Sequence, residues 1–279
     1  MHPVLTINSG SSSLRFALFR VGESLPKVML GKFDRIGLPD ARLSFADVLS
    51  NTSKESRIDA PNHVACVPLL VELLEKRTGV GAVSALGYRV VHGGPRYREP
   101  VRVDRAVLEE LRRISPFAPN HLPDAIALME AFAAKFVQVP QIACFDTAFH
   151  STLPRVAKLL PIPRRYEAKG VQRYGFHGLS YSLLMQELEA VAGAKAASGR
   201  VILAHLGNGA SMSAVRDGKS TDTSMGFTPA AGLAFRNSVP GPRTPSKPFA
   251  TSASSTSNTL RNMARTCRKF GIGDGARND

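Results

Sequence analysis

The sequence is poor in cysteine, with only Cys66, Cys144 and Cys267 among its 279 residues. The three lie far apart and form no Cys-x-x-Cys pair, the spacing that zinc sites and redox motifs use. We therefore expect neither a disulfide framework nor a zinc site. Isolated, buried thiols are the interpretation that fits this pattern.

Long hydrophobic runs are also missing. No apolar segment approaches the roughly 20 residues that an α-helix needs to cross a bilayer. The first residues, Met1-His2-Pro3, lead straight into a strand-like segment, without the basic stretch and cleavage motif of a signal peptide. The composition, 43% apolar and 21% charged, is ordinary for a soluble globular protein. We expect a cytoplasmic protein that does not bind a membrane.

Acidic residues are scarce, 22 against 36 Lys and Arg, which gives a formal charge of +14. A charge of this size favours nucleic acid as a partner. However, residues 234–279 alone hold eight basic and two acidic residues, and no recognised nucleic-acid-binding motif accompanies the charge. We expect no nucleic-acid partner. A nucleic-acid-binding protein is the alternative that charge alone favours, and salt-dependent binding to DNA would reveal it.

Strand-like and helical segments alternate along the first half of the chain, a pattern typical of an α/β protein with mixed sheets. A strand, a Gly/Ser-rich turn and a second strand begin the chain, and the same arrangement recurs at 201–215. The recurrence suggests two duplicated domains. The predicted strands and helices of the first half lie at residues 4–7, 14–19, 64–76, 85–91, 104–114, 123–136 and 141–145.

Two segments have the residue types that bind anions. The turn 8–13, Asn-Ser-Gly-Ser-Ser-Ser, presents backbone N–H groups and hydroxyls, and Arg15 follows closely. Such turns hold phosphate oxygens, although a plain hairpin turn can have the same small residues. Arg89 lies near the end of an apolar strand, where burial is costly unless the guanidinium meets an anion. A small carboxylate and a structural Arg–Asp pair both satisfy that requirement.

Two further residues are candidates for catalysis. Asp146 follows a predicted strand directly, and the carboxyl ends of strands are where α/β proteins gather their chemistry. His177 stands in Gly175-Phe176-His177-Gly178, so its neighbours leave room for a ligand. A structural histidine is the alternative for this position.

Six motifs occur in one order between residues 4 and 233, and together they resemble the acetate kinase family. They are Asn-x-Gly-Ser-Ser-Ser, Arg-Val-Val-His-Gly-Gly, Phe-Asp-Thr-Ala-Phe-His, Arg-Tyr-Gly-Phe-His-Gly, His-Leu-Gly-Asn-Gly and Asp-Thr-Ser-Met-Gly-Phe-Thr-Pro. The resemblance implies an actin- and hexokinase-like (ribonuclease H-like) α/β fold with two duplicated domains around a nucleotide cleft. It places an N-terminal domain at 1–150, nearly complete, and the partial start of a second at 151–233.

The same resemblance implies the reaction: ATP and acetate give acetyl phosphate and ADP, with Mg²⁺ as cofactor. Asn8 would help to position the metal, and Arg89 would bind the acetate carboxylate. Asp146 would be the catalytic acidic residue, and His177 would stabilise the transferring phosphoryl group. His121 lies in a further family segment close to the substrate.

The remaining carried-over residues bind the acyl group or ATP. Val91, Phe176 and Pro229 would form a small apolar pocket that limits the acyl chain. A propionate- or butyrate-type carboxylate kinase is therefore the nearest alternative. The family usually has Lys where this chain has Arg15, which keeps the charge and changes the geometry. The residues expected to contact ATP are Ser11, Ser13, Arg15, His205, Leu206, Gly207, Asn208 and Gly209.

The chain leaves the family pattern after Leu233. The family continues with Gly-Thr-Arg, whose Arg is a second transition-state cation, and then Asp-Leu-Asp-Pro. Neither segment is present here. One inserted base after Phe235 would explain the change, because the shifted frame permits both segments, and sequencing the gene across that codon tests this.

We therefore interpret 234–279 as an out-of-frame, disordered tail that lacks an apolar stripe. The family implies a homodimer formed largely by the second domain. With that domain incomplete, we expect poor stability and little or no turnover. An inactive pseudogene fragment is the remaining alternative.

Overall fold

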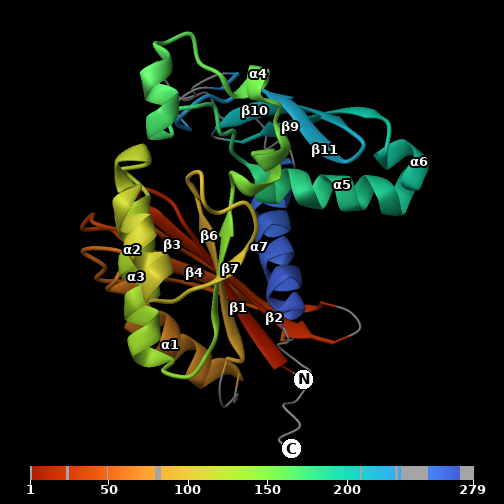
Figure 1. Cartoon of the computed structure of the whole chain (residues 1–279). Coiled ribbons are helices and arrows are strands. Elements are labelled where there is room, and N and C mark those ends of the chain that lie inside the picture. The colour runs from red at the N-terminus through yellow and green to blue at the C-terminus, as the bar shows by residue number, and fades with distance from the viewer. Residues whose placement is uncertain are drawn as a thin grey trace, which may run out of the picture. The chain divides into compact units, whose positions relative to one another are not determined.

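Figure 1 shows the computed structural model, which describes residues 2–22, 25–48, 50–78, 83–207, 209–229, 232–233 and 251–270. The chain divides into two compact units. Unit 1 comprises Met1–Val90, Pro100–Cys144 and Met263–Asp279, and unit 2 comprises Val91–Glu99 and Phe145–Asn262. The domain boundaries predicted from the sequence stay a prediction.

The described residues of unit 1 form a mixed sheet of eight strands in the order β5-β4-β3-β2-β1-β6-β8-β7. Its first five strands are antiparallel neighbours, whereas β6 runs parallel to β1 and β7 is antiparallel to β8. The bounds are β1 (His2–Ser9), β2 (Ser13–Val21), β3 (Lys27–Asp34), β4 (Arg42–Asp47), β5 (Thr52–Arg57), β6 (Ala85–Val90), β7 (Val101–Arg102) and β8 (Gln141–Phe145). All five residues of β8 are buried, as expected of an apolar strand inside a sheet.

Helices pack on both faces of this sheet (Figure 1). On β6, the Tyr88 ring lies 6.1 Å from the Phe132 ring of α3. The preceding residue, Gly87, faces Met263 and Cys267 of α7 instead. Successive residues of a strand point to opposite faces, so α3 and α7 cover different sides. The helices are α1 (Cys66–Thr78), α2 (Arg105–Arg113), the 3₁₀ turn η1 (Ser115–Phe117), α3 (Leu122–Lys135) and α7 (Thr251–Lys269).

Helix α7 corrects the expectation of a disordered tail. Leu260, Met263, Ala264 and Cys267 are all buried, at the i, i+3, i+4, i+7 spacing of one helix face. The many Ser, Thr and Arg residues of this segment predicted disorder. The buried stripe consists partly of small side chains, which a count of strongly apolar residues does not reveal. The prediction is therefore wrong for 251–270, while residues 234–250 and 271–279 lie outside the described residues. The out-of-frame origin stays a prediction.

Unit 2 contains a three-stranded antiparallel sheet, ordered β11-β10-β9. One face packs on α5 through the buried side chains Tyr181, Met185, Leu203 and Val215. The elements are η2 (Ala148–Thr152), α4 (Arg155–Lys158), η3 (Arg164–Lys169), α5 (Gly178–Ala192), α6 (Ala194–Ala197), β9 (Arg200–Leu206), β10 (Ala210–Arg216) and β11 (Lys219–Thr223). The duplicated strand–turn–strand arrangement thus begins unit 1 as β1–β2 and recurs in unit 2 as β9–β10.

Candidate functional site

Two predicted residues of unit 1 are in direct contact. The Nη1 of Arg89 donates a hydrogen bond to Oδ1 of Asn8, at 3.0 Å. The parallel register of β1 and β6 brings them together, since Ile7 pairs with Tyr88 immediately before them. Both strands end within a residue of this point, so the guanidinium lies at the carboxyl edge of the sheet. That edge is where α/β proteins bind ligands.

The same edge has a row of basic side chains. Asn8 pairs with Arg15 on β2, and Arg15 pairs with Lys32 on β3. Residues opposite each other in adjacent strands share a face, so Arg15 and Lys32 lie on one side of the sheet. Lys32 forms an ion pair with Asp34, at 2.8 Å. Sequence reasoning identified Arg15 and missed Lys32, which only strand register places beside it.

The predicted anion-binding turn connects β1 and β2, and whether it binds an anion stays a prediction. The N–H of Gly10 donates to the Ser13 carbonyl, at 2.7 Å, which closes the turn. Ser11 is exposed, and Ser13 is partly buried. His63, which sequence reasoning missed, supports the turn from behind. Its Nε2 lies 2.8 Å from the Gly10 carbonyl oxygen, so this nitrogen donates.

His63 also connects the turn to helix α3. Its Nδ1 lies 3.4 Å from the carboxylate of Asp124, in the first turn of α3. The predicted substrate residue His121 is the N-cap residue of the same helix and is partly buried. Unit 1 thus holds six predicted residues within a linked framework of turn, sheet edge and helix start: Asn8, Ser11, Ser13, Arg15, Arg89 and His121.

In unit 2, the backbone of Asp146 contacts the start of α5 at Gly178, the residue after His177. Asp146 is buried, and its carbonyl accepts a hydrogen bond from the N–H of Gly178, at 2.9 Å. A Cβ at position 178 would lie 2.2 Å from that carbonyl oxygen, so only glycine fits. His177 precedes it with φ +61°, a left-handed conformation unusual for a residue other than glycine. Strained backbone of this kind is typical of functional sites.

The His177 imidazole contacts Ser211 and His205 within unit 2. Its Nδ1 lies 2.8 Å from Oγ of Ser211, on β10. Its ring stacks on His205, with centroids 3.9 Å apart and planes 18° apart. Ser211 is completely buried and also contacts the hydroxyl of Tyr181, at 2.6 Å. Sequence reasoning identified both histidines and missed Ser211 and Tyr181, because no motif marks a residue that supports another.

The predicted ATP turn follows β9 directly. The N–H of Gly207 donates to the Gly209 carbonyl, at 3.3 Å. A Cβ at Gly209 would lie 3.4 Å from Cε1 and Nε2 of His177, so the turn approaches that edge of the ring. Leu206 is exposed at the end of β9. Asn208, predicted to bind ATP, lies outside the described residues.

Predicted acyl-pocket residues cluster in unit 2. Val91 and Phe176 are buried together with Met225, which sequence reasoning missed. The His92 ring packs edge-on against Phe176, with centroids 5.6 Å apart, and its burial lowers the pKa of His92 to about 4. Pro229, the third predicted pocket residue, is partly buried four positions after Met225.

A second buried histidine supports this cluster from behind. His150 Nε2 donates to the Phe176 carbonyl, at 3.0 Å, and its Nδ1 accepts from Oγ of Ser220, at 2.8 Å. Burial lowers the pKa of His150 to about 4, so the ring is neutral near pH 7. The two hydrogen bonds tie the segment around Phe176 to β11.

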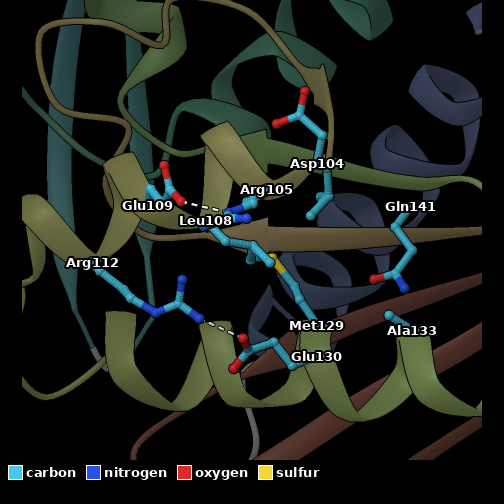
Figure 2. Close-up of a pocket in the computed structure, with 10 residues that line it drawn as sticks. Asp104, Arg105, Leu108, Glu109, Arg112, Met129, Glu130, Ala133 and Gln141 are labelled. Carbon is cyan, nitrogen blue, oxygen red and sulfur yellow. Dashed lines mark hydrogen bonds and ion pairs between the residues drawn. The ribbon is translucent and has the colours of Figure 1, made fainter.

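A separate cavity of about 480 Å³ lies in unit 1 between α2 and α3 (Figure 2). Its charged side chains pair with one another, Arg112 with Glu130 and Arg105 with Glu109. None of the residues predicted to bind substrate, ATP or metal lines it. We therefore do not assign the candidate site to this cavity.

The residues can be tested against a metal ion. Among the described residues, no group of three or more His, Cys, Asp or Glu could hold one. Oδ1 of Asn8 accepts from Arg89, and a positive guanidinium at 3.0 Å opposes direct coordination of a cation by the same oxygen. Mg²⁺ usually keeps several waters and binds through substrate phosphates. A metal held mainly by substrate phosphates, with Asn8 near it and not directly bound, would fit these residues.

Comparison with known proteins decides the family. The family model described as "Acetokinase family" matches residues 3–239. The chain belongs to the acetokinase family. The acetate kinase of Chromobacterium violaceum is 39% identical over 231 residues, which cover 82% of this chain and 57% of that protein. The resemblance predicted from the six motifs is thus confirmed.

Solved structures of an acetate kinase and a propionate kinase confirm the predicted actin- and hexokinase-like α/β fold. The acetate kinase of Porphyromonas gingivalis matches with a TM-score of 0.76 and 30% identity, over 84% of this chain and 60% of that one. A propionate kinase from Francisella tularensis matches with a TM-score of 0.79 and 28% identity, over 97% and 73%. The chain spans less than three fifths of the length of the C. violaceum acetokinase, at 57%.

Proposed function

We propose that this acetokinase transfers the γ-phosphoryl group of ATP to acetate, reversibly, and forms acetyl phosphate and ADP. The observation that carries the proposal is the contact between Arg89 and Asn8 at the carboxyl edge of the sheet. It puts a guanidinium beside the basic row of Arg15 and Lys32. Family membership gives the reaction class, and this cationic edge supplies what two anionic substrates need.

Acetate is already ionised at neutral pH, so the reaction needs no strong general base. A carboxylate oxygen attacks the γ-phosphorus, and the bond from that phosphorus to the bridging oxygen of ADP breaks. The main task of the protein is to position two anions and to offset their repulsion. Arg89 would hold the carboxylate through a bidentate pair. Arg15 would contact the ATP phosphates and His177 the transferring group, while Asp146 would be the catalytic acidic residue.

The nucleotide phosphates would contact backbone N–H groups of the two glycine turns. Ser11 and Ser13 belong to the first turn. His205, Leu206, Gly207, Asn208 and Gly209 belong to the second. Turns of this kind bind phosphate because several backbone dipoles converge on one point. Asn8 would help to position Mg²⁺, whose charge would offset that of the ATP phosphates, and His121 would lie near the substrate.

We propose acetate as the preferred acceptor because the side chains of the predicted acyl site are buried. Val91, Phe176 and Met225 are buried against one another, and Pro229 follows nearby in the chain. A longer acyl chain would have to displace these side chains. Propionate or butyrate is the alternative acceptor, and relative rates with the three acids distinguish them.

The partners of the acetokinase stay proposals as well. We propose ATP, ADP, acetate and acetyl phosphate as its ligands, a homodimer as its assembly and the cytoplasm as its location. Among the described residues, no helix is both long and apolar enough to span a membrane. Light scattering coupled to size-exclusion chromatography tests the dimer.

Formation of acetyl phosphate tests the proposed function. The purified chain is incubated with Mg²⁺, ATP and acetate, and acetyl phosphate is trapped as its hydroxamate. We expect turnover about 10³-fold or more below that of the C. violaceum enzyme, because the Gly-Thr-Arg segment is absent and a transition-state arginine contributes that much. Arg89→Ala should remove the residual product, and Arg102→Ala, on the surface of β7, should not. No acetyl phosphate at all, or equal formation by Arg89→Ala, would contradict the proposal.

A further inference from the structure

Three side chains of unit 2 form a continuous line of hydrogen bonds that ends on His177. Tyr181 OH lies 2.6 Å from Ser211 Oγ, which lies 2.8 Å from His177 Nδ1. Tyr181 and Ser211 are both fully buried. Tyr181 stands one helical turn after His177 on α5, and Ser211 is on the facing strand β10. The line therefore connects two secondary-structure elements of the same packed core.

The protons on this line can be assigned. Burial raises the pKa of Tyr181 to about 12, so the phenol keeps its proton and needs an acceptor for it. Among the described residues, Ser211 Oγ, at 2.6 Å, is the acceptor within hydrogen-bond distance of that hydroxyl.

Ser211 then accepts from Tyr181 and donates to His177. A hydroxyl has one proton, so with two partners it accepts from one and donates to the other. The reverse order would leave the phenol proton without an acceptor within the described part of the chain. Nδ1 of His177 is therefore an acceptor, and the proton of the neutral imidazole is on Nε2.

The protonated nitrogen faces the glycine turn. Nε2 and Cε1 of His177 lie 3.4 Å from the place where a Cβ of Gly209 would be. Stacking on His205 fixes the plane of the ring but does not decide which nitrogen faces the turn. The hydrogen bond from Ser211 makes that choice, because a flipped ring would present a carbon to Oγ.

We propose that Ser211 and Tyr181 are positioning residues that fix His177 as the Nε2–H tautomer, with this N–H presented to a phosphoryl oxygen beside Gly209. The proposal rests on the proposed function and deepens it. Because the Nε2–H of His177 is already oriented, the imidazole need not reorganise when negative charge develops on the transferring phosphoryl group. The wrong tautomer would present a lone pair and repel the same oxygen.

Nitrogen-15 NMR of the full chain tests the tautomer. Histidine is labelled with ¹⁵N, and long-range ¹H–¹⁵N spectra assign the protonated nitrogen, with His177→Gln to identify the signals. We expect the Nε2–H pattern in the parent chain and a mixture of tautomers in Ser211→Ala and Tyr181→Phe. Ser213→Ala is the matched control, since Ser213 is buried on the same strand and bonds Ser220 instead. Ser211→Thr restores a hydroxyl and should restore the pattern.

Kinetics provide the second measurement. Ser211→Ala should lower kcat for acetyl phosphate formation about tenfold, which corresponds to one hydrogen bond, and leave the KM for acetate within about twofold. An Nδ1–H tautomer in the parent chain, or a Ser211→Ala spectrum like that of Ser213→Ala, would overturn the proposal. If the parent chain forms no acetyl phosphate while the tautomer responds as described, the proposed function fails and the assigned tautomer stands.

Discussion

His177 and His205 stack face to face, with ring centroids 3.9 Å apart and planes 18° apart. The two residues are far apart in sequence, one before α5 and the other on β9. The contact keeps the His177 ring nearly parallel to the ring of His205, which lies two residues before Gly207. It therefore links the predicted catalytic histidine to the predicted ATP turn within one unit.

Removing this stack should impair phosphoryl transfer. In His205→Ala the His177 ring loses its neighbour and can tilt, so we expect kcat to fall about tenfold or more, since small misplacements of catalytic groups are costly. His205→Phe keeps a flat ring and should retain most of the activity. The hydroxamate assay measures both. Equal losses in the two variants would mean that His205 acts through its nitrogen atoms instead.

The acyl cluster gives a prediction about substrate size. Met225 is buried with Val91 and Phe176, so Met225→Ala should open space beside the acyl group. We expect the ratio of propionate to acetate turnover to rise, together with a loss of about 2–5 kcal/mol in stability. Met225→Leu keeps the volume and is the matched control. An unchanged ratio in Met225→Ala would remove Met225 from the pocket.

Stability should fall as the pH is lowered from 6.5 towards 4. Burial lowers the pKa of His92 and His150 to about 4, whereas the unfolded chain takes up these protons near pH 6.5. Between those values the unfolded state binds more protons, so each residue contributes a slope of up to about 1.4 kcal/mol per pH unit. Acidic residues with a lowered pKa, such as Asp34, contribute to stability above their unfolded pKa, and this contribution is lost at pH values below this window.

Urea unfolding at several pH values between 4.5 and 6.5 measures this slope. His150→Gln can replace the donor and acceptor of the imidazole and cannot take up the proton, so its slope should be shallower than that of the parent chain. The control is the free energy of unfolding of His150→Gln above pH 7, where His150 is neutral in both states. That value gives any loss of stability that does not depend on pH. Parallel slopes would contradict the assignment of His150 as a buried, neutral base.

The packing of α7 on the sheet can be tested at one contact. A Cβ at Gly87 would lie 2.9 Å from Sγ of Cys267, so Gly87→Ala should destabilise the chain by about 1–3 kcal/mol. Adding Cys267→Ala removes the sulfur and should recover part of the loss. A double-mutant cycle from urea unfolding gives the coupling. Strictly additive effects would show that α7 does not pack there.

The candidate site residues could be proposed from the sequence because their type or motif marks them. Charge and small size mark Arg89, His177 and the two glycine turns as candidates for anion binding, and the position after a strand marks Asp146. Residues that act through geometry were not predictable. Lys32 joins the basic edge only through strand register, and Ser211 reaches His177 only because β10 faces α5.

For the tail, composition failed to predict helix α7. Its Ser, Thr and Arg content predicted disorder, whereas spacing rather than composition determines which face of a helix is buried. Cys267 and Ala264 complete the buried stripe of α7 but contribute little to a count of strongly apolar residues. An inserted base after Phe235 stays a prediction, and the gene sequence across that codon tests it.

The central claim is that the chain binds a small carboxylate through Arg89. Titration of the full chain with ¹³C-labelled acetate, followed by NMR, measures this without requiring turnover. We expect saturable binding of acetate to the parent chain. The affinity should fall about tenfold or more in Arg89→Ala, because charge-assisted hydrogen bonds are lost, and it should stay unchanged in Arg102→Ala. Binding that is absent from the parent chain, or equal in the parent and Arg89→Ala chains, would contradict the account.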